Sequence, residues 1–148
     1  MTRDVDVSFL SGWGGEEPVI DVVLDRFEPR RRDAREFALR HRVLLVKASN
    51  DVPIDVALGA MPFEERAAGR ASDFAVGDGE VLRTCSAEDL VVFKVFAGRP
   101  QDWVDVEGVV IRQAGRLDRE QIVEELEPLL ALKEDADSMP RLEALLAG

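Results

Sequence analysis

The sequence predicts an α/β (α+β) protein in which a mixed β-sheet is flanked by helices and followed by a helical carboxy-terminal part. Apolar and polar residues alternate along residues 4–10 and again along 52–58, which is typical of half-buried strands. A continuous apolar run at 43–46 is typical of a central strand. Later in the chain the apolar residues recur at helical spacing instead. We therefore expect a sheet core over residues 1–85 and a helical part of the same domain over residues 86–148.

Local signals place the elements of the first half. The glycines of Ser11–Gly15 predict a loop, and Glu16, Glu17 and Pro18 are residue types that favour the first turn of a helix. Gly77-Asp78-Gly79 is typical of a hairpin turn. In chain order we expect a helix at 16–27, a hairpin of the strands at 43–46 and 52–58, a short helix at 61–71, and a second hairpin over 74–84.

Helices fill the second half. Ser86 followed by Asp89 is a variant of the capping box and predicts a helix at 87–97 that is apolar nearly all round. Asp102 and Asp105 lie three residues apart, on one face of the next predicted helix. Two further amphipathic helices, expected at 118–133 and 140–146, are assigned to the core.

Length and composition fit one globular domain. The 148 residues can bury a substantial core, and 46% hydrophobic with 33% charged residues is a soluble rather than a disordered balance. No apolar run approaches the roughly 20 residues that span a membrane, and no signal-peptide pattern is present. Cys85 is the single cysteine, so we expect a cytoplasmic protein in which this thiol is a small buried hydrophobe.

The charge is unevenly distributed. A formal net charge of −11 argues against a protein that coats itself in nucleic acid. Between Asp25 and Lys47, however, eight Lys or Arg residues stand against four Asp or Glu residues, a local charge of +4. Such a segment either guides a phosphate-bearing substrate or forms a solvated helix face and linker, and the sequence leaves both open.

Three carboxylates are candidates for a metal site. Asp4 and Asp6 share one side of the first strand, because side chains two residues apart leave a strand on the same face. Asp55 occupies a similar place in the second alternating strand. If the two strands are neighbours, the three carboxylates converge on a site that suits Mg²⁺ or Mn²⁺, which serve phosphoryl and nucleotidyl transfer. The alternative is a solvated strand edge with surface carboxylates.

Lys94 is the only charge in the interior of the apolar helix at 87–97. It projects between Leu90 and Val91, which makes a purely solvated position hard to achieve. Its stem either reaches through apolar neighbours to a carboxylate or phosphate, or extends to the surface.

These motifs resemble a known family. Thr2-Arg3-Asp4-Val5-Asp6-Val7 resembles the Asp-x-Asp element of the nucleotidyltransferase fold shared by polymerase-beta-like enzymes, and Ile54-Asp55-Val56 resembles its third acidic strand. The set Ser86 to Leu90, Lys94, Arg99 and Asp102-Trp103-Val104-Asp105 is similar to the carboxy-terminal signature of nucleotidyltransferases related to abortive-infection toxins of the AbiE type.

The resemblance implies a Mg²⁺- or Mn²⁺-dependent transferase that moves a nucleoside monophosphate from a nucleoside triphosphate to an acceptor hydroxyl, with toxin-type enzymes among its forms. It assigns the metal to Asp4, Asp6 and Asp55, and adds Lys94 as the fourth catalytic residue. The acceptor (an RNA end, a protein hydroxyl or a small molecule) stays open, as does a homo-oligomer or a cognate antitoxin as partner; no membrane is implied. Nucleotide binding is assigned to Thr2, Arg3, Lys94, Asp102 and Asp105.

One departure from the family pattern supplies an alternative. Members of the fold normally carry a Gly-Gly or Gly-Ser turn ahead of the Asp-x-Asp element, whose backbone amides cradle the triphosphate. Here Gly14-Gly15 follows the aspartates. Either the gene begins upstream, or the segment comes from a partner or swapped chain, or the domain has kept the fold without the activity. In the last case we expect a non-catalytic module that binds a protein partner, in a toxin–antitoxin pair or a regulatory role.

Overall fold

The computed structural model describes residues 4–148, so Thr2 and Arg3, which are predicted to bind nucleotide, lie outside the described residues. The described chain is a mixed α+β protein, which confirms the predicted class. It divides into two compact units, with the division after Arg66.

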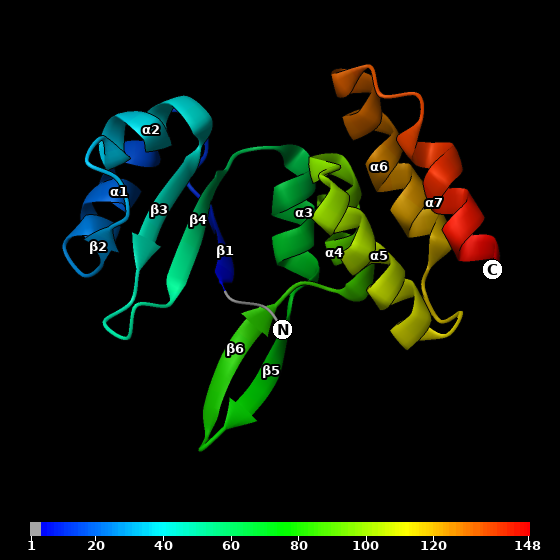
Figure 1. The fold of residues 1–148 in the computed structure, drawn as a ribbon, viewed down its shortest axis with the longest axis horizontal. Coiled ribbons are helices and arrows are strands. Elements are labelled where there is room, and N and C mark those ends of the chain that lie inside the picture. The colour runs from blue at the N-terminus through cyan, green and yellow to red at the C-terminus, as the bar shows by residue number, and fades with distance from the viewer. Residues whose placement is uncertain (1–3) are drawn as a thin grey trace. The chain divides into compact units, whose positions relative to one another are not determined.

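The first unit is built on a four-stranded mixed sheet (Figure 1). The strand order is β1-β4-β3-β2, in which β1 runs parallel to β4 and the other pairs are antiparallel. The predicted hairpin of the two inner strands is therefore confirmed. The elements are β1 (Val5–Leu10), α1 (Glu16–Leu24), β2 (Glu28–Pro29), α2 (Ala34–His41), β3 (Val43–Lys47) and β4 (Pro53–Gly59), followed by α3 (Pro62–Arg70), which crosses the division.

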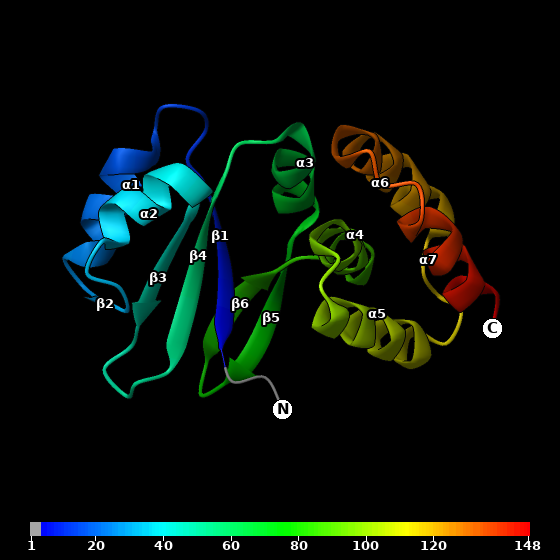
Figure 2. The same ribbon diagram turned by 45° about the horizontal axis from the view of Figure 1, so that its top comes forward.

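Helices α1 and α2 cover one face of this sheet (Figure 2). Ile20 of α1 and Ala38 of α2 are fully buried against the inner strands, where Leu44, Val46 and Leu58 are also buried. The residues that α2 buries in this core, Ala34 and Ala38, are both small. The opposite face carries the alternate residues of each strand.

The edge strand β1 is not covered in the same way. Val5, Val7 and Phe9 are in register with Ile54, Val56 and Leu58 of β4, so they continue the apolar face that α1 and α2 cover. These three residues are nevertheless 47%, 41% and 50% exposed. We call Val5, Val7 and Phe9 the β1 stripe.

The second unit joins a two-stranded hairpin to four helices. Its core contains Val92 and Val95 of α4, Val106 of α5, Ile122 of α6 and Leu142 of α7, all fully buried. The elements are β5 (Ser72–Gly77), β6 (Glu80–Thr84), α4 (Ala87–Ala97), α5 (Pro100–Gln113), α6 (Arg119–Lys133) and α7 (Ser138–Ala147).

Several details differ from the prediction. The helix expected at 16–27 ends at Leu24, and α2 was not predicted. Strands β5 and β6 pair only with each other in the described chain, and they belong to the second compact unit. Cys85 is exposed, not buried as expected, because it lies where the isolated hairpin meets α4.

Candidate active site

The register of the first sheet brings two of the predicted metal ligands side by side. Asp6 of β1 is in register with Asp55 of β4. Neighbouring strands lie about 4.8 Å apart, and residues in register project from the same face. Both aspartates lie opposite α1 and α2, because the next pair, Val7 and Val56, belongs to the covered face. Asp4 lies one residue ahead of β1 and is exposed.

Arg30, which was not predicted as a site residue, reaches this pair. Its backbone N–H donates to the Leu45 carbonyl oxygen at 3.0 Å, and Leu45 is in register with Asp55. Asp6, Asp55, Leu45 and Arg30 thus form a row across the sheet. The Arg30 guanidinium donates a hydrogen bond to the Asp55 carboxylate. The sequence signal for Arg30 was the run of arginines at 30–32, which does not tell which of the three faces the sheet.

Much of the basic segment between Asp25 and Lys47 is paired within the first unit. Arg31 binds Asp33 through two hydrogen bonds of 2.9 Å, which hold the pKa of Asp33 below its usual value. These pairs neutralise part of the local positive charge, so less of it is left to attract a distant substrate. Further pairs are Arg35 with Asp21, Arg42 with Glu16, and Lys47 with Glu28 and Asp51.

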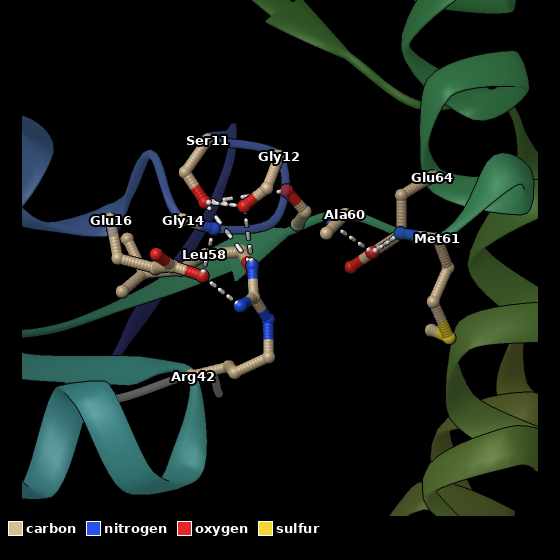
Figure 3. A network of polar contacts seen from close by, with 10 residues as sticks. Ser11, Gly12, Gly14, Glu16, Arg42, Leu58, Ala60, Met61 and Glu64 are labelled. Carbon is tan, nitrogen blue, oxygen red and sulfur yellow. Dashed lines mark hydrogen bonds and ion pairs between the residues drawn. The ribbon is translucent and has the colours of Figure 1, made fainter.

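The glycine-rich loop between β1 and α1 is tied down by Arg42 (Figure 3). The Arg42 guanidinium donates to the Gly12 carbonyl oxygen at 3.1 Å and to Ser11 Oγ at 3.2 Å, and it pairs with Glu16. The hydrogen bond from Arg42 lowers the pKa of Glu16. Glycine is required at Gly15, because an added Cβ would lie 2.2 Å from the Ser11 carbonyl oxygen. The loop is therefore held in place by the hydrogen bonds of Arg42 and by its ion pair with Glu16.

In the second unit, Lys94 reaches two of the predicted aspartates. Its Nζ lies 3.0 Å from the Asp105 carboxylate and 3.6 Å from that of Asp102. The Lys94 side chain is 22% exposed, so the lysine is held between α4 and α5 and does not simply extend into solvent. Of the two possibilities that the sequence left open, the contact with a carboxylate is the one observed.

Asp102 is deeply buried, with a side chain only 1% exposed. Its carboxylate accepts the backbone N–H of Arg99 at 3.0 Å and Arg99 Nε at 2.8 Å, which caps the start of α5. Burial alone would raise the pKa of Asp102, but the hydrogen bonds from Arg99 and the charges of Arg99 and Lys94 outweigh it, and the pKa is lowered.

A second buried ionic cluster was not predicted. Asp89 is fully buried, and both of its oxygens accept hydrogen bonds from Arg70, at 2.6 and 3.1 Å. Arg70 also lies 2.9 Å from Glu125, so it joins the end of α3 to α4 and α6. Ser86 caps α4 by accepting the Asp89 N–H at 3.0 Å, which confirms the predicted cap. No local pattern indicates that Arg70 and Glu125 contact each other or Asp89, because the three residues lie on different helices.

The residues of the first unit suit a divalent ion in their chemistry. Mg²⁺ at nucleotide sites is commonly held by one or two carboxylates, with water and phosphate oxygens completing its shell. Asp6 and Asp55, on neighbouring strands and on one face, supply such a pair. Among residues 4–148, no group of three or more His, Cys, Asp or Glu side chains is placed to hold a metal ion.

The predicted site residues thus fall into two sets. Asp6 and Asp55 are joined by strand register in the first unit, and Lys94, Asp102 and Asp105 by ion pairs in the second. Over residues 4–148, no helix combines the length and the apolar character needed to cross a bilayer. No protein-family model matches the chain, and no curated protein sequence matches it significantly.

Proposed function

We propose that the chain is a Mg²⁺-dependent nucleotidyltransferase, which transfers a nucleoside monophosphate from a nucleoside triphosphate to an acceptor hydroxyl. The observation that carries the proposal is the in-register placement of Asp6 and Asp55 on the face of the sheet opposite α1 and α2. Carboxylate oxygens placed in this way are donors of the kind that suit Mg²⁺ or Mn²⁺. The resemblance of the surrounding motifs to the nucleotidyltransferase fold supports the same function.

The residues have distinct roles in this proposal. Asp6 and Asp55 would hold the divalent ion, which when bound neutralises charge on the phosphates, and the resemblance assigns Asp4 to the same ion. Asp55 accepts the proton of the acceptor hydroxyl. The acceptor oxygen then forms a bond to the α-phosphorus, the bond from that phosphorus to the oxygen bridging the β-phosphate breaks, and pyrophosphate leaves.

The second unit holds the other residues that the resemblance assigned. Within this unit, the ion pairs of Lys94 with Asp102 and Asp105 fix the position of its ammonium group. The deep burial of Asp102 gives that arrangement a rigid base.

The proposal is tested by thermal unfolding with each nucleoside triphosphate, with and without Mg²⁺, beside an assay for released pyrophosphate. A ligand at about 100 times its dissociation constant stabilises by roughly 2.7 kcal/mol, which is readily seen in the midpoint. We expect a Mg²⁺-dependent rise in the wild type that is lost in Asp6→Asn/Asp55→Asn. Asp25→Asn is the control, because Asp25 is an exposed carboxylate of the same unit, at the end of α1. Equal behaviour of the two variants would contradict the assignment.

The β1 stripe favours one alternative, a nucleotidyltransferase-like module that binds a protein partner. Three large apolar side chains between 41% and 50% exposed lie along an edge strand, and such edges can pair with another chain. If no nucleoside triphosphate stabilises the wild type in the presence of Mg²⁺, and no pyrophosphate is released, this reading replaces the catalytic one.

A further inference from the structure

We propose that Arg30 is a phosphate-binding residue of the candidate site, and that a divalent ion displaces it from Asp55 so that it turns to the triphosphate. The inference rests on the proposed function and deepens it by naming a residue that neither the motifs nor the resemblance assigned. It predicts that Arg30 affects metal binding and phosphate binding with opposite signs.

The position of Arg30 is fixed by the backbone, while its side chain is held by one partly exposed pair. The hydrogen bond from its N–H to the Leu45 carbonyl oxygen anchors the residue beside β3. From there the side chain crosses over Leu45 to the Asp55 carboxylate. The Arg30 and Asp55 side chains are 30% and 33% exposed, so breaking their ion pair carries a small cost. The guanidinium can therefore leave Asp55 and stay on the same face of the sheet.

Charge balance gives the order of events. The guanidinium of Arg30 offsets the negative charge of Asp55. A divalent cation bound by Asp55 competes with Arg30 for the same carboxylate oxygens. The released guanidinium presents planar, paired N–H donors that match phosphate oxygens. A triphosphate that arrives with the ion supplies the negative charge that Arg30 has lost.

The first measurement is the affinity for Mn²⁺ alone in the wild type and in Arg30→Gln. Binding is detected through the paramagnetic signal of the ion. Removal of the competing ion pair should tighten Mn²⁺ binding by about three- to fivefold, the range expected for an exposed pair. Arg31→Gln is the matched control, because it removes the same charge from the neighbouring residue. Arg31 pairs with Asp33, which lies outside the row of Asp6, Asp55, Leu45 and Arg30. We expect a change of less than about twofold in that control.

The second measurement is the affinity for inorganic tripolyphosphate in the presence of Mg²⁺, a probe that carries the phosphates without a base. Arg30→Gln should weaken this binding by about tenfold or more, because charge-assisted hydrogen bonds to phosphate are lost. Arg30→Lys keeps the charge but not the paired donors, so it should bind Mn²⁺ like the wild type and tripolyphosphate with intermediate affinity. Circular dichroism of each variant checks that the fold is kept.

Opposite signs for the two probes in Arg30→Gln, with Arg31→Gln unchanged, support the inference. If Mn²⁺ binding depends on Asp55 but Arg30→Gln changes neither probe, or weakens both, the inference is overturned while the proposed function stands. If Mn²⁺ binding is the same in wild type, Asp55→Asn and Arg30→Gln, the metal site itself is wrong and both proposals are overturned.

Discussion

Asp102 and Asp105 are one helical turn apart on α5, yet they differ sharply in burial. The Asp102 side chain is 1% exposed, and its carboxylate binds Arg99 and Lys94, while Asp105 is 39% exposed and binds Lys94. Asp102→Asn keeps the shape but removes the charge on which these contacts depend. We expect a loss of about 1–3 kcal/mol in the free energy of unfolding, against less than about 1 kcal/mol for Asp105→Asn. Urea unfolding of the two variants measures both values, and equal losses would show that burial does not decide the role of Asp102.

The sequence predicted this cluster in part. An ionisable residue inside an apolar helix either reaches a polar partner or extends to the surface, so the helical pattern around Lys94 predicted its contact with a carboxylate as one of two possibilities. The burial of the Asp102 side chain could not be predicted from the sequence, because it depends on how α5 packs against its neighbours. The role of Arg30 could not be predicted from the sequence. Residues 30–32 are all arginine, and only the pairing of the strands decides which of the three side chains faces Asp55.

At the scale of elements, the buried cluster of Arg70, Asp89 and Glu125 holds the end of α3 to α4 and α6. Arg70→Met should destabilise the chain by about 3 kcal/mol, because Asp89 would remain buried without its partner. Arg112→Met on the exposed side of α5 is the control, with an expected change within about 0.5 kcal/mol. The measurement is urea unfolding, repeated in an Asp89→Asn background. If Arg70→Met costs as much in that background as in the wild type, the Arg70–Asp89 pair is not the cause.

Elements with terminal signals were predictable and those without were not. Helix α4 runs from Ala87 to Ala97 as expected, since Ser86 caps its start and Gly98, at φ 71°, ends it. Helix α2 was missed because its buried residues, Ala34 and Ala38, are too small to give an apolar stripe among the arginines. The pairing of β1 with β4 was stated only as a condition, because long-range pairing of parallel strands leaves no local trace in a sequence.

On the scale of the whole molecule, two electrostatic effects oppose each other. The net charge of −11 produces repulsion at neutral pH, and protonation of carboxylates relieves it. Against this, hydrogen bonds hold the pKa values of several carboxylates below their usual range. They are Glu16, Asp33, Asp51, Asp102 and Asp135. A lowered pKa in the folded state contributes stability above the unfolded value of about 4, and that contribution is lost as pH falls through the folded value.

The balance of charge repulsion and paired carboxylates predicts how the free energy of unfolding depends on pH. We expect the free energy of unfolding to change little from pH 7 to about 5, where relief of repulsion acts while the paired carboxylates stay charged, and to fall below about pH 4 as they protonate. Urea unfolding at pH 7, 5, 4 and 3 measures the profile, and 0.5 M NaCl separates the effects because salt screens distant charges more than short contacts. The fall should persist in salt and should be smaller in Asp102→Asn, which has already lost one such carboxylate, than in Asp25→Asn. A wild type that gains stability down to pH 3 would show instead that net repulsion, not the paired carboxylates, dominates the electrostatics of this chain.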